Sequence, residues 1–405
     1  MDTVVPESVG VSSARLQRID SLIQRYIEQQ QLPGAIVVLL RHSQVVHFAC
    51  YGHMDAARTA PQPMRADTLF RIFSMTKPIT CAAVLLLYEE GYLRLSDPVS
   101  LFIPGFKDVQ VLVRQTEAGL ELAPLQRPIT IYDLLTHTAG LGYGLDALTP
   151  VDTLFQQARM MHMDETLAEK VQRIVQMPLH HQPGLRYVYS ISTDVLGHVV
   201  ELISGMPLDA FFKQRIFAPL GMMDTDFYVP GEKQSRLAVL YTLVPHVGLV
   251  NMAMLDASKV THFLTGAWID KIEKPLFLSG GGGLVSTAAD YLRFAMLLRK
   301  GGEVDGLRLL SRKTVELMTM NHLQKEQFKF PGVGYGFGLE VITDMALAQG
   351  LDSVGAYYGS GVANTQFWVD RQEDLVGLLM MQVATPTPHP LRADIRTLAL
   401  QAIVD

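Results

Sequence analysis

Segments with strand composition lie near both ends of this chain, and segments with helical periodicity dominate the region between them. Residues 35–52 form two β-rich runs around a short polar break at 41–44, which is typical of a hairpin. Strand composition returns in three later runs, at 334–342, 365–370 and 374–383. A fold that pairs these strands has to bring the two ends of the chain into one lobe.

Helical periodicity of the apolar side chains predicts amphipathic helices over 13–29, 80–92, 165–177, 193–216 and 286–301. A short helix is predicted after Thr130, whose side chain is suited to cap it. We therefore predict an α/β fold (α+β in some schemes) in which residues 1–95 and 275–405 form one domain from both chain ends. Residues 96–274 are predicted to form a mostly helical inserted domain, with a ligand cleft between the two.

Composition excludes several classes of protein. Hydrophobic residues make up 48% of the 405 residues and charged residues 18%, so the chain has too much apolar surface to stay disordered. A net charge of −6 without a run of like charges argues against a nucleic-acid partner. No apolar run reaches the roughly 18 residues that span a bilayer, and the N-terminal segment lacks the pattern of a secretory signal. We expect a cytoplasmic globular protein without a membrane partner.

Common catalytic and metal-binding motifs are absent from the sequence. It contains no G-x-S-x-G, H-E-x-x-H, G-x-x-x-x-G-K-[ST] or C-x-x-C pattern. The adjacent residues His180 and His181 have no carboxylate or third ligand at the spacing of a metal site, so we predict surface or structural histidines. Cys50 and Cys81 are expected to be buried free thiols. We expect neither a metal nor a cofactor.

Ser74 and Lys77 form the only S-x-x-K pattern in the chain, at the start of a predicted helix. A separation of three residues places the hydroxyl and the amine on one helical face. The unpaired N–H groups of a helix N-terminus stabilise developing negative charge, and a desolvated Lys77 could lose its proton and act as base for the serine. Taken alone, the pattern is explained more simply by Ser74 as an N-cap and Lys77 as a solvated first-turn residue.

Two further elements could complete an active site. Tyr189 follows the turn at 182–184 and precedes a predicted helix, where its phenol could relay a proton to a leaving group. Three small residues at 359–361, Gly-Ser-Gly, precede a predicted strand and would let a backbone or a substrate approach closely. Each element also has a structural interpretation, as a packing tyrosine and as a plain turn or bulge.

Together these elements resemble the serine β-lactamase and penicillin-binding-protein superfamily, in particular its class C-like esterases, often called family VIII carboxylesterases. The matching segments are FRIFSMTKPIT (70–80), LRLSDPVSLFIPGF (93–106), ITIYDLLTHTAGL (129–141) and SGGGGLVSTAADYLRFAMLLRKGGEVDGLRLLS (279–311). The resemblance covers nearly the whole chain. It implies the β-lactamase/transpeptidase-like fold, an antiparallel sheet flanked by helices plus a mostly helical domain.

The resemblance also implies a role for each candidate residue. Ser74 would be the acylated nucleophile, Lys77 its base, and Tyr189 the general acid and base of the Y-x-N motif. The backbone N–H groups of Ser74 and Val362 would form the oxyanion hole. Gly359-Ser360-Gly361 would take the place of the usual K-T-G on the edge strand.

Two positions depart from the superfamily pattern. Ile191 stands at the third position of Y-x-N, and Gly359-Ser360-Gly361 carries no lysine, so the groups that hold the amide and carboxylate of a β-lactam are absent. An apolar Ile191 and an uncharged third motif suit a neutral ester, because nothing would pair a buried substrate carboxylate. We therefore expect a carboxylesterase that cleaves small to medium neutral esters through a Ser74 acyl-enzyme.

Three alternatives remain open from the sequence. The same acyl-enzyme could pass its acyl group to an alcohol, and GVANTQFWVD (361–370) resembles the corresponding segment of the fungal polyketide acyltransferases in this superfamily. Weak β-lactamase or D-peptidase activity is a second option. A binding protein that kept the fold and lost the chemistry is a third. In each enzymatic case the partner is a small molecule, and the sequence carries no signal for an oligomeric state.

Overall fold

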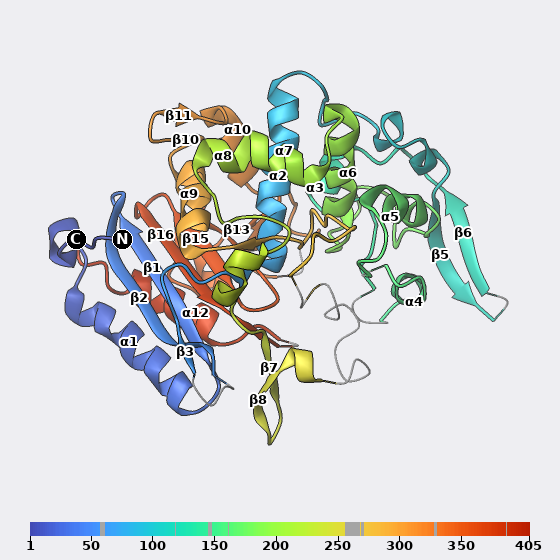
Figure 1. Cartoon of the computed structure of the whole chain (residues 1–405). Coiled ribbons are helices and arrows are strands. Elements are labelled where there is room, and N and C mark those ends of the chain that lie inside the picture. Colours follow the sequence, from blue (N-terminus) through green and yellow to red (C-terminus); the bar gives the residue numbers. More distant parts are fainter. Residues whose placement is uncertain are drawn as a thin grey trace.

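The computed structural model describes residues 1–56, 61–117, 119–144, 148–160, 162–255, 268, 271–327, 330–385 and 387–405. The largest element in these residues is an eight-stranded sheet in the order β12-β13-β14-β15-β16-β1-β2-β3 (Figure 1). Its strands are β1 Gly34–Arg41, β2 Gln44–Asp55, β3 Gln62–Pro63, β12 Val333–Tyr335, β13 Glu340–Ile342, β14 Tyr357–Ser360, β15 Gln366–Asp370 and β16 Leu375–Met381. All neighbouring pairs are antiparallel.

The two ends of the chain build this sheet together, as the strand pattern predicts. β1 pairs with β2 on one side and with β16 on the other, in the register Ala35 to Met381 through Arg41 to Leu375. The hairpin between β1 and β2 turns at His42 and Ser43, which have φ values of 52° and 64°. The chain termini also meet, since the N–H of Val404 donates to the carbonyl of Gly10 at 2.9 Å (Figure 1).

Helices cover both faces of the sheet, which explains why every residue of β1 is buried. One face packs against α1 and α12 through Ala35, Val37, Leu39, Leu379 and Met381. The other face packs against α2 and α9 through Ile36, Val38, Leu40, Leu378 and Met380. Alternate side chains of a strand point to opposite faces, so a continuous apolar run fills two separate layers of core. The antiparallel sheet with flanking helices confirms the predicted fold class.

The observed helices are α1 Ser13–Glu28, α2 Thr76–Glu89, α3 Ile131–Leu135, α4 Pro150–Gln157, α5 Leu167–Ile174, α6 Ser192–Ser204, α7 Leu208–Phe212, α8 Ala218–Leu220, α9 Ala288–Arg299, α10 Arg312–Thr319, α11 Met345–Ala348 and α12 Leu391–Leu400. Thr130 caps α3, as predicted, and the structure shows that it does so in a capping box with Asp133. The amphipathic segment predicted over 193–216 is not one continuous helix. α6 ends at Ser204, because Gly205 takes a left-handed φ of 68°, and α7 follows.

The strand predicted over 334–342 is also two strands, β12 and β13, joined by a turn through Gly338 at φ 77°. The remaining strands are β4 Phe70–Arg71, β5 Gln110–Thr116, β6 Gly119–Pro124, β7 Tyr241–Val244, β8 Gly248–Asn251, β9 Val285–Ser286, β10 Glu303–Val304, β11 Leu307–Arg308 and β17 Val383–Ala384. Four of these strands form the hairpins β5–β6 and β7–β8 inside the segment expected to be mostly helical. The division into two domains stays a prediction.

Two smaller expectations concern the cysteines and membrane spans. Both cysteines are free thiols, but Cys50 is exposed on β2 and only Cys81 is buried, so the burial predicted for Cys50 is wrong. Within the described residues no single helix has the length and apolar character of a membrane span. The helices Ser192–Ser204 and Leu208–Leu220 meet those criteria only as a pair, across a bend of 79°.

Candidate active site

Ser74 lies in a tight turn between β4 and α2, on the 3-10 segment Phe73–Met75. The preceding residue, Phe73, is held at a φ of 43°, a left-handed conformation that is costly for a bulky side chain. Buried contacts stabilise this turn, among them the hydrogen bond from the Tyr291 hydroxyl to the Met75 carbonyl at 2.9 Å. Ser74 makes no side-chain cap on α2 and stays partly exposed, so the interpretation of Ser74 as an N-cap is wrong.

The structure brings Ser74, Lys77 and Tyr189 together. The Tyr189 hydroxyl donates to Ser74 Oγ at 2.7 Å, across a separation of 115 positions in the sequence. Lys77 Nζ lies 3.4 Å from the same Oγ. The lysine side chain is 2% exposed, which contradicts its interpretation as a solvated first-turn residue. A serine hydroxyl within reach of an amine and a phenol has the geometry that an activated nucleophile requires.

The glycine-rich turn at 279–283 contacts the side chain of Lys77. The Gly281 carbonyl accepts a hydrogen bond from Lys77 Nζ at 2.6 Å, and the Gly281 N–H donates to Asp194 at 3.1 Å. A Cβ at this position would lie 2.6 Å from Asp194 Oδ2 and 2.7 Å from the Tyr143 hydroxyl, so only glycine fits. Burial raises the pKa of Asp194, although Ser279 and Lys77 oppose the shift.

The third motif precedes a strand, β15, as predicted, but it does not lie on an edge strand. Gly359 and Ser360 end β14, which is an interior strand of the sheet because β13 and β15 flank it. The pairing of β14 with β13 ends at Tyr358. On that side, the backbone of Gly359 and Ser360 therefore has no neighbouring strand and faces the cleft. A Cβ on Gly361 would lie 2.4 Å from the Ile72 carbonyl, and this close approach brings the end of β14 beside the turn that carries Ser74.

Two cavities meet at Ser74, and Tyr143, Tyr189 and Ser360 line both of them. The smaller has a volume of about 250 Å³ and contains Val362, whose N–H donates no hydrogen bond within the described residues. The larger has a volume of about 770 Å³ and contains Lys77 and Gly359. Ile191, by contrast, is fully buried at 0% exposure in the core and lines neither cavity.

Tyr143 is a site residue that the sequence reasoning missed. Its hydroxyl accepts from Lys77 Nζ at 3.0 Å, and its ring centroid lies 5.4 Å from that of Tyr189. Burial, with the nearby Asp194 charge, raises the pKa of the Tyr143 phenol well above its ordinary value, so the phenol stays protonated. Tyr143 lies only two positions after the segment at 129–141, so extending that segment could have found it.

We expect Tyr143→Phe to lower kcat for an ester substrate by about tenfold to a hundredfold. The change removes one hydrogen-bond partner of Lys77 and keeps the packed ring, so KM and thermal stability should change little. Steady-state kinetics with a matched Tyr92→Phe control, at an exposed tyrosine, measure the effect. Equal kcat in the two variants would show that Lys77 does not depend on this phenol.

Two charged residues of the cleft were also missed. Arg392, from α12, lines the smaller cavity, and its Nε has no hydrogen-bond partner within the described residues. Glu340, from the start of β13, lines the larger cavity, and burial raises the pKa of its carboxyl group. Neither residue belongs to a local motif, because only the packing of α12 and β13 against the cleft brings them there.

The two adjacent histidines have different surroundings. His180 lines the larger cavity, with Nε2 3.4 Å from Asp152 Oδ1. His181 is buried, and its Nδ1 lies 2.8 Å from the Gln182 carbonyl. Within the described residues, no group of three or more histidine, cysteine, aspartate or glutamate side chains is arranged to hold a metal ion.

Burial lowers the pKa of His181 from its ordinary value of 6.5 to about 4. The unfolded chain takes up this proton near pH 6.5 and the folded chain only near pH 4, so the free energy of unfolding should fall as the pH drops through this window. The shift corresponds to about 3 kcal/mol. His181→Asn should flatten this slope in urea unfolding at pH 7, 5.5 and 4.5. The exposed His246→Asn should leave the slope unchanged, and identical slopes for both variants would contradict the assignment.

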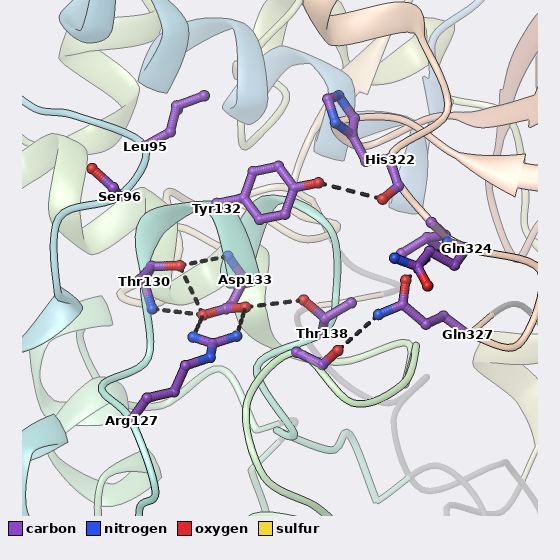
Figure 2. A pocket seen from close by; sticks show the side chains of 12 residues that line it. Leu95, Ser96, Arg127, Thr130, Tyr132, Asp133, Thr138, His322, Gln324 and Gln327 are labelled. Carbon is purple, nitrogen blue, oxygen red and sulfur yellow. Dashed lines mark hydrogen bonds and ion pairs between the residues drawn. The ribbon is translucent and has the colours of Figure 1, made fainter.

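A third cavity, of about 510 Å³, lies beside α3 and does not include Ser74 (Figure 2). In its wall Asp133 accepts two hydrogen bonds from Arg127, at 2.6 and 2.8 Å, and one from the Thr130 N–H at 2.8 Å. Gln327 lines both this cavity and the larger active-site cavity, and its Nε2 donates to the Gly184 carbonyl at 2.7 Å. These bonds anchor α3 and the loop that leads to Tyr189.

Comparison with known proteins gives consistent matches. A family model described as Beta-lactamase matches residues 19–401. The protein Rv1367c of Mycobacterium tuberculosis is 36% identical over 363 residues, which cover 87% of this chain and 86% of that protein. Esterase EstB of Burkholderia gladioli is 32% identical over 392 residues, covering 94% of this chain and 93% of EstB. The solved structure of EstCE1, described as a hydrolase with promiscuous acyltransferase activity, matches with a TM-score of 0.78 at 27% identity, over 96% of this chain and 99% of EstCE1.

Proposed function

The chain belongs to the β-lactamase family, and from that premise we propose that it is a serine ester hydrolase, a carboxylesterase that works through an acyl-enzyme on Ser74. Its fold is the β-lactamase/transpeptidase-like fold. The observation that carries the proposal is the placement of the Tyr189 hydroxyl and Lys77 Nζ at 2.7 and 3.4 Å from Ser74 Oγ. The names of EstB and EstCE1 support ester hydrolysis as the reaction.

The hydrogen bonds around Lys77 support its role as the base. A neutral amine has two N–H donors and one lone pair. We propose that Lys77 enters the reaction in this form: its two donors have acceptors in the Gly281 carbonyl and the Tyr143 hydroxyl, and its lone pair takes the proton of Ser74. Ser74 Oγ then attacks the ester carbonyl, and a bond forms between that oxygen and the carbonyl carbon.

The remaining groups serve the tetrahedral intermediate and its collapse. The negative charge on the former carbonyl oxygen is stabilised by the N–H groups of Ser74 and Val362, which line the same cavity. Tyr189 protonates the departing alcohol as the bond between carbonyl carbon and alkoxy oxygen breaks, and the proton held by Lys77 replenishes the phenol. Water then attacks the acyl-enzyme by the same route and releases the acid.

We propose small to medium neutral esters as substrates. Ile191 adds no polar group to the cleft, and the third motif at 359–361 supplies no cation. p-Nitrophenyl butyrate should therefore have a higher kcat/KM than p-nitrophenyl hemisuccinate, which carries a carboxylate. The reverse preference would point to pairing with the Arg392 guanidinium instead.

Acyl transfer is the alternative that a specific observation favours, because EstCE1 is described as having promiscuous acyltransferase activity. The acyl group of the acyl-enzyme would then pass to an alcohol oxygen in place of water. The partitioning of the acyl group between water and an added alcohol distinguishes hydrolysis from acyl transfer. With an alcohol added at millimolar concentration, a hydrolase releases mainly acid, whereas a transferase releases mainly the new ester.

Turnover of nitrocefin would reveal weak β-lactamase activity, and turnover of a D-alanyl peptide would reveal D-peptidase activity.

Intact-protein mass spectrometry tests the proposal directly. The wild-type protein is incubated briefly with p-nitrophenyl butyrate while released nitrophenol is followed. We expect a butyryl adduct that peptide mapping assigns to Ser74, together with turnover. Slow hydrolysis without any adduct would overturn the proposal in favour of a binding protein.

A cytoplasmic location and the absence of nucleic-acid and membrane partners stay predictions.

A further inference from the structure

His137 follows α3 and its C-terminal cap, Thr136, in the segment between this helix and the cleft. It is 1% exposed and has a φ of 56°, a left-handed conformation that costs a histidine energy unless its surroundings hold it. The capping box at Thr130 and the Arg127–Asp133 ion pair fix the start of α3 (Figure 2). These contacts therefore fix the backbone that leads to His137.

The ring and backbone of His137 both contact the segment that carries Tyr189. The His137 carbonyl accepts from the Val188 N–H at 2.9 Å. Its Nδ1 lies 3.3 Å from the donating Ser190 N–H and 3.1 Å from Ser190 Oγ. The imidazole centroid lies 5.0 Å from the ring centroid of Tyr189 itself. His137 thus contacts the residues before and after Tyr189 as well as its ring.

Residues 187–190 have no regular secondary structure, so no ladder of backbone hydrogen bonds orients them. α6 begins only at Ser192, after Tyr189. The placement of the Tyr189 hydroxyl at 2.7 Å from Ser74 Oγ consequently depends on side contacts. The rings of Tyr187 and Tyr335 also pack around His137, with centroids 5.8 and 5.4 Å from the centroid of the imidazole.

The imidazole is suited to this contact because it is neutral. Burial lowers the pKa of His137 well below its ordinary value. A neutral imidazole has one nitrogen that accepts a hydrogen bond, and the Ser190 N–H supplies a donor to Nδ1. A protonated ring would present a donor there and lose this bond.

We propose that His137 is a positioning residue for the reaction, which orients Tyr189 so that its hydroxyl stays within hydrogen-bond distance of Ser74. This inference rests on the proposed ester hydrolysis. His137 lines neither cavity at Ser74, so it acts through Tyr189 and not on the substrate. Misplacing a catalytic group by about 1 Å can cost a hundredfold in rate.

The test is a double-mutant cycle between His137→Asn and Tyr189→Phe. Asparagine tolerates a positive φ, so the first variant should fold. We expect His137→Asn alone to lower kcat for p-nitrophenyl butyrate by about tenfold to a hundredfold with KM nearly unchanged. In the Tyr189→Phe background the same substitution should change kcat by less than about threefold, because the hydroxyl that it positions is already absent.

Two outcomes would overturn the inference. If the rate losses of the two substitutions multiply, His137 acts independently of Tyr189, as a merely structural residue would. If His137→Asn leaves kcat unchanged while wild type is active, His137 has no such role, and the proposed function still stands. Absence of wild-type turnover would instead overturn the proposed function itself.

Two further variants keep the test decisive. His198→Asn changes another buried histidine, on α6, and should leave kcat within about twofold of wild type. Thermal melting shows whether each variant folds. If His137→Asn does not fold, Ser190→Ala enters the same cycle, since it removes the hydroxyl contact with Nδ1 together with the hydrogen bond to Ser192 Oγ. A loss that is not suppressed by Tyr189→Phe would again contradict positioning through the tyrosine.

Discussion

Ser74→Ala is expected to lower kcat for p-nitrophenyl butyrate by at least about 10⁴-fold and to abolish the butyryl adduct. The substitution removes the atom that forms the covalent bond, and no nearby group replaces it. The remaining rate would come from the N–H groups and from binding alone. Steady-state kinetics and intact mass, measured on the same samples, check both parts of this expectation.

The fold should survive this change. Ser74 Oγ makes hydrogen bonds only to Tyr189 and Lys77 within the described residues, and alanine fits the turn without new contacts. Ser21→Ala, on an exposed position of α1, is a matched control that should keep full activity. An adduct that persists in Ser74→Ala would place the nucleophile elsewhere and remove the basis of the proposed function.

Tyr189→Phe is expected to lower kcat by about 10²- to 10⁴-fold while KM changes little. The phenylalanine ring keeps the packing against His137 and Tyr143, whose ring centroids lie 5.0 and 5.4 Å away. Only the hydroxyl at 2.7 Å from Ser74 Oγ is lost, and with it the donor that serves the departing alcohol.

The dependence on the leaving group tests this assignment. Esters of weakly basic alcohols such as p-nitrophenol need little protonation, whereas ethyl esters need a proton to depart. The loss in Tyr189→Phe should therefore be larger for ethyl butyrate than for p-nitrophenyl butyrate. Equal losses of kcat for the two esters would contradict a role of Tyr189 as general acid. They would favour a role confined to the attack of Ser74 on the ester carbonyl.

The pairing of Ser74 with Lys77 was predictable because it is local. The two residues lie three positions apart where the 3-10 turn Phe73–Met75 leads into α2, and backbone geometry over one helical turn brings such side chains to one face. The Thr130 capping box and the hairpin over 35–52 follow from equally short-range patterns. Tyr189 was found because its motif position follows a recognisable turn and precedes α6.

Interactions across long separations were not predictable. Tyr143 lies 66 positions from Lys77, and Ser190 lies 53 positions from His137, so their hydrogen bonds depend on how the segments after α3 and before α6 pack together. The placement of Gly359 and Ser360 on an interior strand with one free edge likewise depends on where the pairing of β13 stops.

The sequence by itself therefore determined the pairing of Ser74 with Lys77, the helices and strands with clear periodicity, and the family to which the chain belongs. Only the tertiary structure decided that Lys77 is buried beside Ser74 with the Gly281 carbonyl and the Tyr143 hydroxyl as partners, and that His137 and Tyr143 pack against Tyr189. The physical reason is that spacing within one turn is set by backbone geometry, whereas burial and contact between distant segments are set by the packing of the whole core.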